Sequence, residues 1–250
     1  MEPKEAKAIR KRLEVFEGIN GRPLEKAMRH QSHLLFTWMD KLIRNNKILD
    51  EVEKIIGPNI LCWGSNLFIK EPKTKDFISW HQDATYWGLE PLDKIVTAWV
   101  AISDVPVESG AMKFLPESHK WGQREHQDTY SEKNLLSRGQ EIAVEVNEED
   151  AVDVVLKAGE FSLHHVLLAH GSHKNISGNR RIGCAIRYIP TAVRQTISRN
   201  SAVLVRGKDD YDHFDLLDSP ETDLSEKAIS LHAYSTSEIH STVHMDAAKD

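Results

Sequence analysis

The spacing of apolar residues changes once along the chain, at Gly57-Pro58, and this change constrains the fold more than any other feature. Before it, apolar residues recur at intervals of three and four, which is typical of amphipathic helices. We expect a first helix over residues 4–16, a second that opens at Pro23 and runs to Trp38, and a third over residues 48–56.

After Gly57-Pro58 the apolar spacing becomes two, which is typical of strands. The expected strands, separated by Gly, Pro, Asp and Asn, are 60–70, 77–80, 95–103, 111–115, 141–146, 151–156, 161–169 and 182–189. Short strands that follow a helical cap, without strand–helix alternation, predict a mainly β protein. We expect an antiparallel jelly roll, a double-stranded β-helix of the cupin-like kind, with the N-terminal helices packed on one sheet.

One domain accommodates the 250 residues. We expect it to span 1–219, with a helical cap at about 1–56 and a core at about 57–191. The polar tail, 220–250, lacks a clear period, so we expect it to be loosely docked or partly disordered, with a second functional element as the alternative. The segment 121–140 also lacks a period and is long for a connector, so it is interpreted as a functional loop or lid rather than a strand link, with a solvated loop favoured over one that closes on the substrate.

Composition excludes several classes of partner. A net charge of −6 leaves no electrostatic footprint for nucleic acid or an anionic membrane. No apolar run could span a bilayer, and the charged start of the chain does not resemble a signal peptide, so we expect a cytoplasmic protein. Cys62 and Cys184 are expected to be buried thiols. The sequence leaves the oligomeric state open.

Histidine is frequent, with 13 residues, and two of these histidines frame a candidate metal site. In an extended segment, His81 and Asp83 point to the same side and could bind one ion, although a surface pair is a common alternative. His170 ends an apolar strand, where an unpaired imidazole is costly. Two imidazoles and one carboxylate form the facial triad of non-haem Fe(II) oxygenases, which leaves positions open for a co-substrate and dioxygen.

Arg181 follows His170 by eleven residues and starts the next strand. A guanidinium is a natural bidentate partner for a carboxylate, such as the far end of a keto acid that chelates the iron. Ser172, two residues after His170, could add a hydroxyl to the same group.

These residues belong to a wider set of motifs. Together they resemble the phytanoyl-CoA dioxygenase family over residues 57–191. The motifs are Trp80-His81-Gln82-Asp83, Thr97–Ala101, Glu108–Met112, Leu115–His119, and His170-Gly171-Ser172 with Asn175, Ser177 and Arg181.

The resemblance implies a double-stranded β-helix with Fe(II) held by His81, Asp83 and His170. It implies that Arg181 and Ser172 hold 2-oxoglutarate, and that Trp99 lines the co-substrate pocket. It further implies hydroxylation of a substrate with dioxygen, with release of succinate and CO2. Because halogenating relatives lack the carboxylate, the presence of Asp83 disfavours halogenation.

Strand parity supplies further candidates. Arg187 shares a face with Arg181, so it should point inward and bind a substrate anion, unless an internal salt bridge neutralises it. Asn66 is a candidate contact for co-substrate or substrate. Lys70, on the same strand face as Asn66, is expected to be a solvated charge. His164 has the strand parity of His170 but lies too far along to replace it, so we expect it to support the site or the core.

Thr85, Tyr86 and Trp87 follow Asp83 directly, so we expect them to line the cavity above the iron, with a core role as the alternative. The leading hypothesis is a hydroxylase of a small, polar or anionic metabolite. Two alternatives stay open at this point: a cupin-like metal-dependent isomerase or hydrolase that does not use 2-oxoglutarate, and a catalytically silent binding module.

Overall fold

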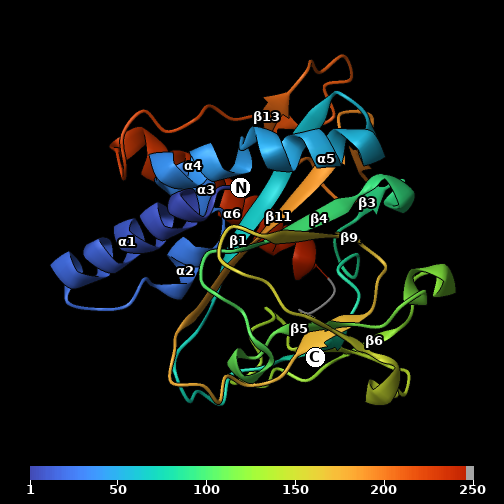
Figure 1. Ribbon diagram of the computed structural model, residues 1–250. Helices are drawn as coiled ribbons and strands as arrows, with labels where there is room; N and C mark the ends of the chain where they lie inside the picture. The colour runs from blue at the N-terminus through green and yellow to red at the C-terminus, as the bar shows by residue number, and fades with distance from the viewer. Residues whose placement is uncertain (246–250) are drawn as a thin grey trace.

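The computed structural model describes residues 1–245, and its centre is a pair of facing β-sheets (Figure 1). The larger sheet has the order β14-β13-β1-β11-β4-β9. Its strands are β1 (Ile60–Lys70), β4 (Val96–Ala101), β9 (Phe161–His165), β11 (Arg181–Pro190), β13 (Ser201–Arg206) and β14 (Asp215–Leu216). The arrangement is the expected jelly roll, in which β1, β11, β4 and β9 pair antiparallel.

The smaller sheet has the order β2-β10-β5-β8. Its strands are β2 (Ile78–His81), β5 (Met112–Phe114), β8 (Val152–Val154) and β10 (His170–Ser172). Two short ribbons complete the β structure. They pair β3 (Leu89–Glu90) with β12 (Arg194–Gln195), and β6 (His126–Asp128) with β7 (Gln140–Ile142).

The N-terminal helices cover the outer face of the larger sheet, as expected (Figure 1). They are α1 (Pro3–Asn20), α2 (Lys26–Arg29), α3 (Ser32–Leu35), α4 (Thr37–Ile43) and α5 (Asn46–Ile56). Ile182, Cys184, Ile186 and Tyr188 of β11 pack against them. The intervening residues of β11 therefore face the space between the sheets, where Arg187 lines a cavity.

The expected second helix is wrong in detail, because the chain breaks into α2, α3 and α4. Gln31 has a left-handed backbone (φ +49°) and its N–H donates to Ser65 O in β1 at 2.7 Å. Phe36 is extended between α3 and α4. The apolar residues keep their helical spacing across these breaks. They pack in one core with β1, and the chain there forms short helices instead of one long helix.

The expected strand over 161–169 is also wrong beyond His165. The chain turns there, with Leu168 N–H donating to His165 O at 2.9 Å, and resumes as β10 in the other sheet. In β10, His170 pairs with His81 of β2 and with Phe114 of β5. This crossing between sheets brings the two histidines together.

The tail differs most from expectation. Residues Glu226–Val243 form α6, which begins at Ser225, whose hydroxyl accepts from Ala228 N–H at 3.2 Å. The helix docks through Ser235, whose hydroxyl accepts from the Gln31 side chain at 3.2 Å. The expectation of a loose tail is therefore wrong for α6, and its part over 246–250 lies outside the described residues.

Cys62 and Cys184 are buried free thiols, as expected. None of the helices within residues 1–245 combines the length and apolar character needed to cross a membrane.

Candidate metal centre

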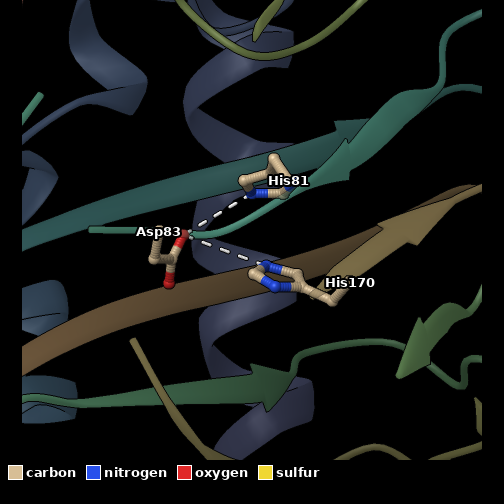
Figure 2. A group of neighbouring side chains, drawn as sticks. All are labelled: His81, Asp83 and His170. Atoms are coloured by element: carbon tan, nitrogen blue, oxygen red, sulfur yellow. Dashed lines mark ion pairs between the residues drawn. The ribbon is translucent and has the colours of Figure 1, made fainter. Parts of the chain in front are cut away.

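The structure brings His81, Asp83 and His170 together between the two sheets (Figure 2). His81 ends β2, Asp83 follows two residues later, and His170 begins β10. Asp83 Oδ1 lies 3.5 Å from His81 Nε2 and 3.8 Å from His170 Nε2. One ligand atom from each residue lies within 4.8 Å of the others, and all three residues are buried, which fits a metal ion held by two nitrogens and one oxygen.

Backbone carbonyls orient both imidazoles. His81 Nδ1 lies 2.9 Å from Ser79 O, and His170 Nδ1 lies 2.9 Å from Leu168 O. A carbonyl oxygen only accepts, so each Nδ1 carries the hydrogen and each Nε2 keeps its lone pair for an ion. Burial, together with the adjacent His81 ring, lowers the pKa of His170, which keeps its imidazole in the neutral form that binds metals.

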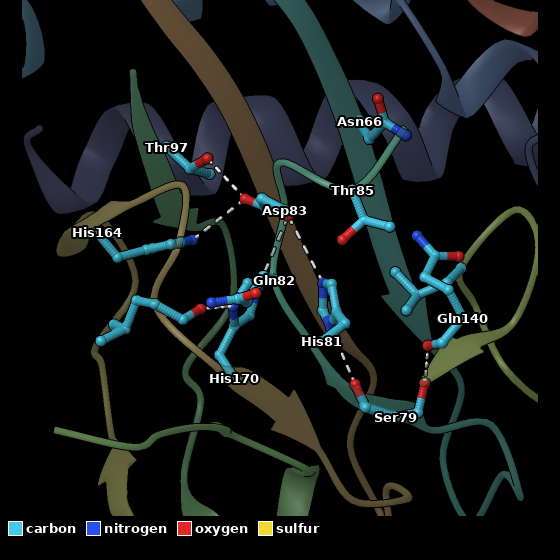
Figure 3. Close-up of polar contacts among 12 residues, drawn as sticks. Asn66, Ser79, His81, Gln82, Asp83, Thr85, Thr97, Gln140, His164 and His170 are labelled. Carbon is cyan, nitrogen blue, oxygen red and sulfur yellow. Dashed lines mark hydrogen bonds and ion pairs between the residues drawn. The ribbon is translucent and has the colours of Figure 1, made fainter. Parts of the chain in front are cut away.

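The second carboxylate oxygen of Asp83 points the other way (Figure 3). Thr97 Oγ1 donates to Oδ2 at 2.7 Å, and His164 Nε2 lies 3.6 Å from the same oxygen. Burial alone would raise the pKa of Asp83, but contacts with the His164 and His81 imidazoles outweigh it and hold this pKa well below its usual value. The carboxylate is thus ionised, with Oδ1 directed at the histidines.

The Gln82 side chain holds the segment between His81 and Asp83 in place. This side chain is fully buried. Its Nε2 donates to Leu167 O at 2.8 Å and to Gly122 O at 2.9 Å. It therefore ties the turn before His170 to the chain that carries His81 and Asp83, a role that sequence analysis did not assign.

A small pocket of about 30 Å3 adjoins the triad, and Ser172 and Trp99 line it. Trp99 lies over Gly183, where an added Cβ would stand 2.0 Å from the indole ring, so only glycine fits. The Arg181 guanidinium lies 5.3 Å from the Trp99 ring centre. Trp99 thus lies close to Arg181 and lines the same pocket as Ser172, whereas Arg181 is not among the residues that line this pocket.

Arg181 is fully buried, and only part of its hydrogen-bonding capacity is used. Its Nη1 donates to Gly110 O at 3.2 Å, whereas Nε and Nη2 have no hydrogen-bond partner within residues 1–245. Burial lowers its pKa to about 10, so the side chain stays charged at neutral pH. A buried cation with unpaired donors indicates an anion site.

The expectation for Lys70 is wrong. This residue is fully buried rather than solvated, and its Nζ donates to Ser172 Oγ at 2.7 Å and to His173 O. Burial, together with the charge of Arg181, lowers its pKa to about 6. The signal was present in the parity of β1, because Lys70 shares a strand face with Asn66 and pairs with Arg181 in β11.

The sequence model of the family described as phytanoyl-CoA dioxygenase matches residues 3–183. The chain belongs to the phytanoyl-CoA dioxygenase family. The match begins well before residue 57, where the resemblance was expected to start.

Three similar proteins illustrate the relationship. A probable alpha-ketoglutarate-dependent hypophosphite dioxygenase of Stutzerimonas stutzeri is 31% identical over 184 residues, which are 69% of this chain and 60% of the relative. Peroxisomal phytanoyl-CoA dioxygenase of Homo sapiens is 31% identical over 52% of this chain and 39% of its own length. The chain thus spans 60% or less of these relatives.

The third is a solved structure, the non-heme monooxygenase ThoJ in its apo form. It is 30% identical, covers 100% of this chain and 94% of its own, and superposes with a TM-score of 0.88. A nickel complex of ThoJ superposes with a TM-score of 0.80 at 29% identity, over 98% of this chain and 92% of its own.

This member of the phytanoyl-CoA dioxygenase family has a larger cavity, of about 330 Å3, that also adjoins the triad. His81, Asp83, Thr85 and Trp87 line it, as does Arg187. Arg187 Nη1 donates to Asn66 Oδ1 at 2.8 Å, and its guanidinium lies 5.5 Å from the Trp87 ring centre. Within residues 1–245 no carboxylate forms a salt bridge with Arg187, so the internal ion pair considered above is not observed.

Asn66 lies in this larger cavity and not in the small pocket beside Trp99. Its Oδ1 accepts from Arg187, and its Nδ2 lies 2.6 Å from His30 Nδ1. The structure therefore places Asn66 with the substrate candidates, rather than with Arg181 and Ser172.

Tyr86 does not line the cavity, contrary to expectation. Its backbone is left-handed (φ +70°), which turns the side chain away from its neighbours Thr85 and Trp87. The hydroxyl donates to Asp128 at 3.1 Å, and the Arg138 guanidinium stacks 3.7 Å from the ring centre. Tyr86 thus anchors the segment 121–140, of which Leu135, Leu136 and Gln140 line the cavity.

Proposed function

We propose that the chain is an Fe(II)- and 2-oxoglutarate-dependent dioxygenase that hydroxylates a small polar or anionic metabolite and releases succinate and CO2. The observation that carries this proposal is the arrangement around the triad. Two imidazoles and one ionised carboxylate converge on one point, and a buried, incompletely paired arginine lies nearby.

The chain's own residues have distinct tasks in this reaction. His81 Nε2, His170 Nε2 and Asp83 Oδ1 would hold Fe(II), which, with 2-oxoglutarate, would supply the oxidising chemistry. Arg181 and Ser172 would bind the far carboxylate of 2-oxoglutarate, and Trp99 would cover it. Lys70 would support the same carboxylate indirectly, because its Nζ donates to Ser172 Oγ and lies near the charge of Arg181.

The pocket beside Trp99 has to open for the co-substrate. Its volume of about 30 Å3 equals roughly that of one water molecule. It shares lining residues with the larger cavity, namely Phe68, His81, Asp83, Leu136 and Arg187. Opening along this shared wall would join the two and exclude bulk water from the reacting atoms.

Arg187 supports an anionic or polar substrate. Among the described lining residues of the larger cavity the only carboxylate is Asp83, which belongs to the triad. Burial lowers the pKa of His30 to about 4, so Arg187 is the side chain that brings positive charge to the wall beside Asn66. One similar protein is described as a hypophosphite dioxygenase, which is consistent with an anion at this place.

The test measures succinate formed from 2-oxoglutarate by the Fe(II)-loaded protein against a panel of anionic metabolites. We expect substrate-dependent succinate in the wild type and loss of it in His81→Ala. His173→Ala is the matched control, because His173 is exposed and three residues from His170. Unchanged turnover in His81→Ala would refute the proposal.

Arg181 separates this function from the metal-only isomerase or hydrolase. Replacing Arg181 by Gln should abolish succinate formation in an oxygenase, whereas it would spare a reaction that uses no keto acid. A silent binding module would bind metal and 2-oxoglutarate yet form no succinate with any compound of the panel.

A further inference from the structure

The first part of the segment 121–140 is hydrogen-bonded to the chain between two of the metal ligands. Both ends of the Gln82 side-chain amide take part in this contact. Gln82 Nε2 donates to Gly122 O at 2.9 Å, and Gln82 Oε1 accepts from Arg124 N–H at 2.8 Å. This part of the segment is therefore joined to the chain that carries two residues of the triad.

The backbone N–H of Gln82 belongs to the same contact. Strand β2 ends at His81, which pairs with His170 of β10, so Gln82 lies beyond the last pair of this ladder. Gln82 is fully buried, and buried backbone N–H groups are nearly always paired in folded proteins. This N–H donates to His126 Nε2 at 2.9 Å. A side chain of β6 thus provides the acceptor that the ladder no longer supplies.

The His126 imidazole is held in the form that can accept this hydrogen bond. Its Nδ1 lies 2.9 Å from Arg124 O, and a carbonyl oxygen only accepts, so Nδ1 carries the hydrogen and Nε2 keeps its lone pair. Burial lowers the pKa of His126 to about 4, so the ring is neutral at neutral pH. Thr85 Oγ1, which accepts from Gln123 Nε2 at 2.8 Å, lies 3.1 Å from Nδ1 and gives the ring a further contact.

The peptide that His126 fixes lies between two metal ligands. His81 and Asp83 face each other from one short stretch of chain, with Asp83 Oδ1 3.5 Å from His81 Nε2. Because a peptide is planar, the direction of the Gln82 N–H sets the plane of the peptide that joins His81 to Gln82. Rotation of this plane would turn the His81 and Asp83 side chains relative to each other. The acceptor at His126 Nε2 therefore controls the angle at which these two ligands meet one ion.

We propose that His126 is a positioning residue of the metal site, whose Nε2 holds the Gln82 peptide so that His81 and Asp83 bind one ion. His126 does not belong to the group of side chains that could hold the ion itself. The proposal rests on the proposed function, because the site that His126 supports is the candidate Fe(II) centre. It assigns residues 122–126 to the metal site, and it leaves the later part of the segment as the candidate lid.

Titration of the full chain with Co(II), followed by its visible absorption, tests this proposal. His126→Leu removes the acceptor, whereas in His126→Gln the side-chain Oε1 can take the place of Nε2. Loss of a contact that supports metal ligands typically lowers metal affinity by about 10–100-fold. We expect His126→Leu to bind Co(II) on the order of tenfold more weakly and with a changed absorption spectrum. His126→Gln should restore both the affinity and the spectrum of the wild type.

Two further variants complete the design. Gln127→Leu is the matched control, because Gln127 is the exposed neighbour of His126 on β6, and it should bind Co(II) as the wild type does. If His126→Leu does not fold, His126→Asn replaces it in the comparison with His126→Gln. The Asn Oδ1 atom stands one bond short of the Nε2 position, so His126→Asn should bind Co(II) more weakly than His126→Gln.

A role in folding alone would lower the melting temperature of His126→Leu and leave the Co(II) affinity and spectrum of the folded variant unchanged, which would overturn the proposal. It would also be overturned if the Gln variant bound Co(II) as weakly as the Leu variant, or if the Asn and Gln variants bound it equally well. The proposed function fails separately, as a wild-type protein that binds metal but forms no succinate, and the comparison of Co(II) affinities does not depend on that result.

Discussion

The two carboxylate oxygens of Asp83 contact different partners. Oδ1 faces the two histidines, and Oδ2 accepts from Thr97 Oγ1 at 2.7 Å. Thr97 and His164 are paired directly across the β4–β9 ladder, so both reach Oδ2 from one side. This arrangement leaves Oδ1 alone for the ion and keeps other coordination positions free.

Thr97→Val tests that arrangement. The variant keeps the shape but loses the donor to Oδ2, and loss of such a supporting hydrogen bond typically lowers metal affinity by about 10–100-fold. Titration of the apo protein with Co(II), followed by its absorption, measures the change. Ser162→Ala on β9 is the control, because Ser162 Oγ has no hydrogen-bond partner within residues 1–245. Equal affinity of Thr97→Val and wild type would contradict this account of Asp83.

Burial of Lys70 at the candidate co-substrate site lowers the folding stability of the apo protein. Burial lowers its pKa to about 6, below that of the unfolded chain, so the unfolded state binds more protons between that pH and about 10.5. Lys70 therefore destabilises the apo protein most at low pH, and the penalty fades as pH rises through this window.

Replacing Lys70 by Met should consequently raise the melting temperature of the apo protein at pH 7, through a stabilisation on the order of a few kcal/mol. The gap between variant and wild type should narrow towards pH 10. In the same variant, 2-oxoglutarate affinity should fall at least tenfold while metal affinity is unchanged. Thermal unfolding across pH and calorimetric titration measure both. A less stable variant with intact co-substrate binding would show that Lys70 is structural only.

The direction of a side chain could be predicted where it depends on strand parity and short spacing in the sequence. His81 and Asp83 are two residues apart in extended chain, and Arg181 and Arg187 share a face of β11, so their directions follow from the sequence. Tyr86 was misplaced because its left-handed backbone interrupts that parity. Lys70 was misplaced because its burial depends on Ser172, a hundred residues away.

Among the elements, α6 and the segment before β7 close the larger cavity together. Arg138 joins them: its guanidinium forms an ion pair with Asp128, and its Nη1 donates to Val243 O at 3.0 Å. It also stacks on Tyr86. One side chain thus links the chain after Asp83, the candidate lid and the end of α6.

Arg138→Gln should weaken the contact between α6 and the segment before β7 without affecting the metal site. We expect faster amide hydrogen exchange in residues 135–140 and 240–245, with unchanged Co(II) affinity, because no contact of Arg138 involves a metal ligand. Arg124→Gln is the matched control, since Arg124 lies on the same segment and forms no ion pair within residues 1–245. If exchange at α6 were the same in both variants, Arg138 would not be the link.

Elements with a strong apolar period were predictable, and α6 was not. Strand β1 has the predicted bounds, and β11 differs only by one residue at each end. The inward residues of α6 include Ala228, Ser235 and Thr242, which are too small or polar to produce a hydrophobic period. The helix docks through hydrogen bonds such as that between Gln31 and Ser235. Such contacts leave no periodic pattern in the sequence.

At the scale of the whole molecule, the site depends on the two sheets facing each other. The smaller sheet supplies His81 and His170, and the larger sheet supplies Thr97 (Figure 3), Arg181 and Arg187. The switch of period at Gly57-Pro58 was sufficient to predict the jelly roll. It could not predict which strands become neighbours, since the order of strands in each sheet depends on contacts between distant segments.

The central claim is that one site binds a metal and, through it and Arg181, one molecule of 2-oxoglutarate. Calorimetric titration of the full chain with 2-oxoglutarate, with and without one equivalent of Fe(II) under anaerobic conditions, tests it most directly. The account predicts one 2-oxoglutarate per chain only when metal is present, and loss of that binding in Arg181→Gln with metal binding retained. Binding that needs no metal, or that persists in Arg181→Gln, would contradict it.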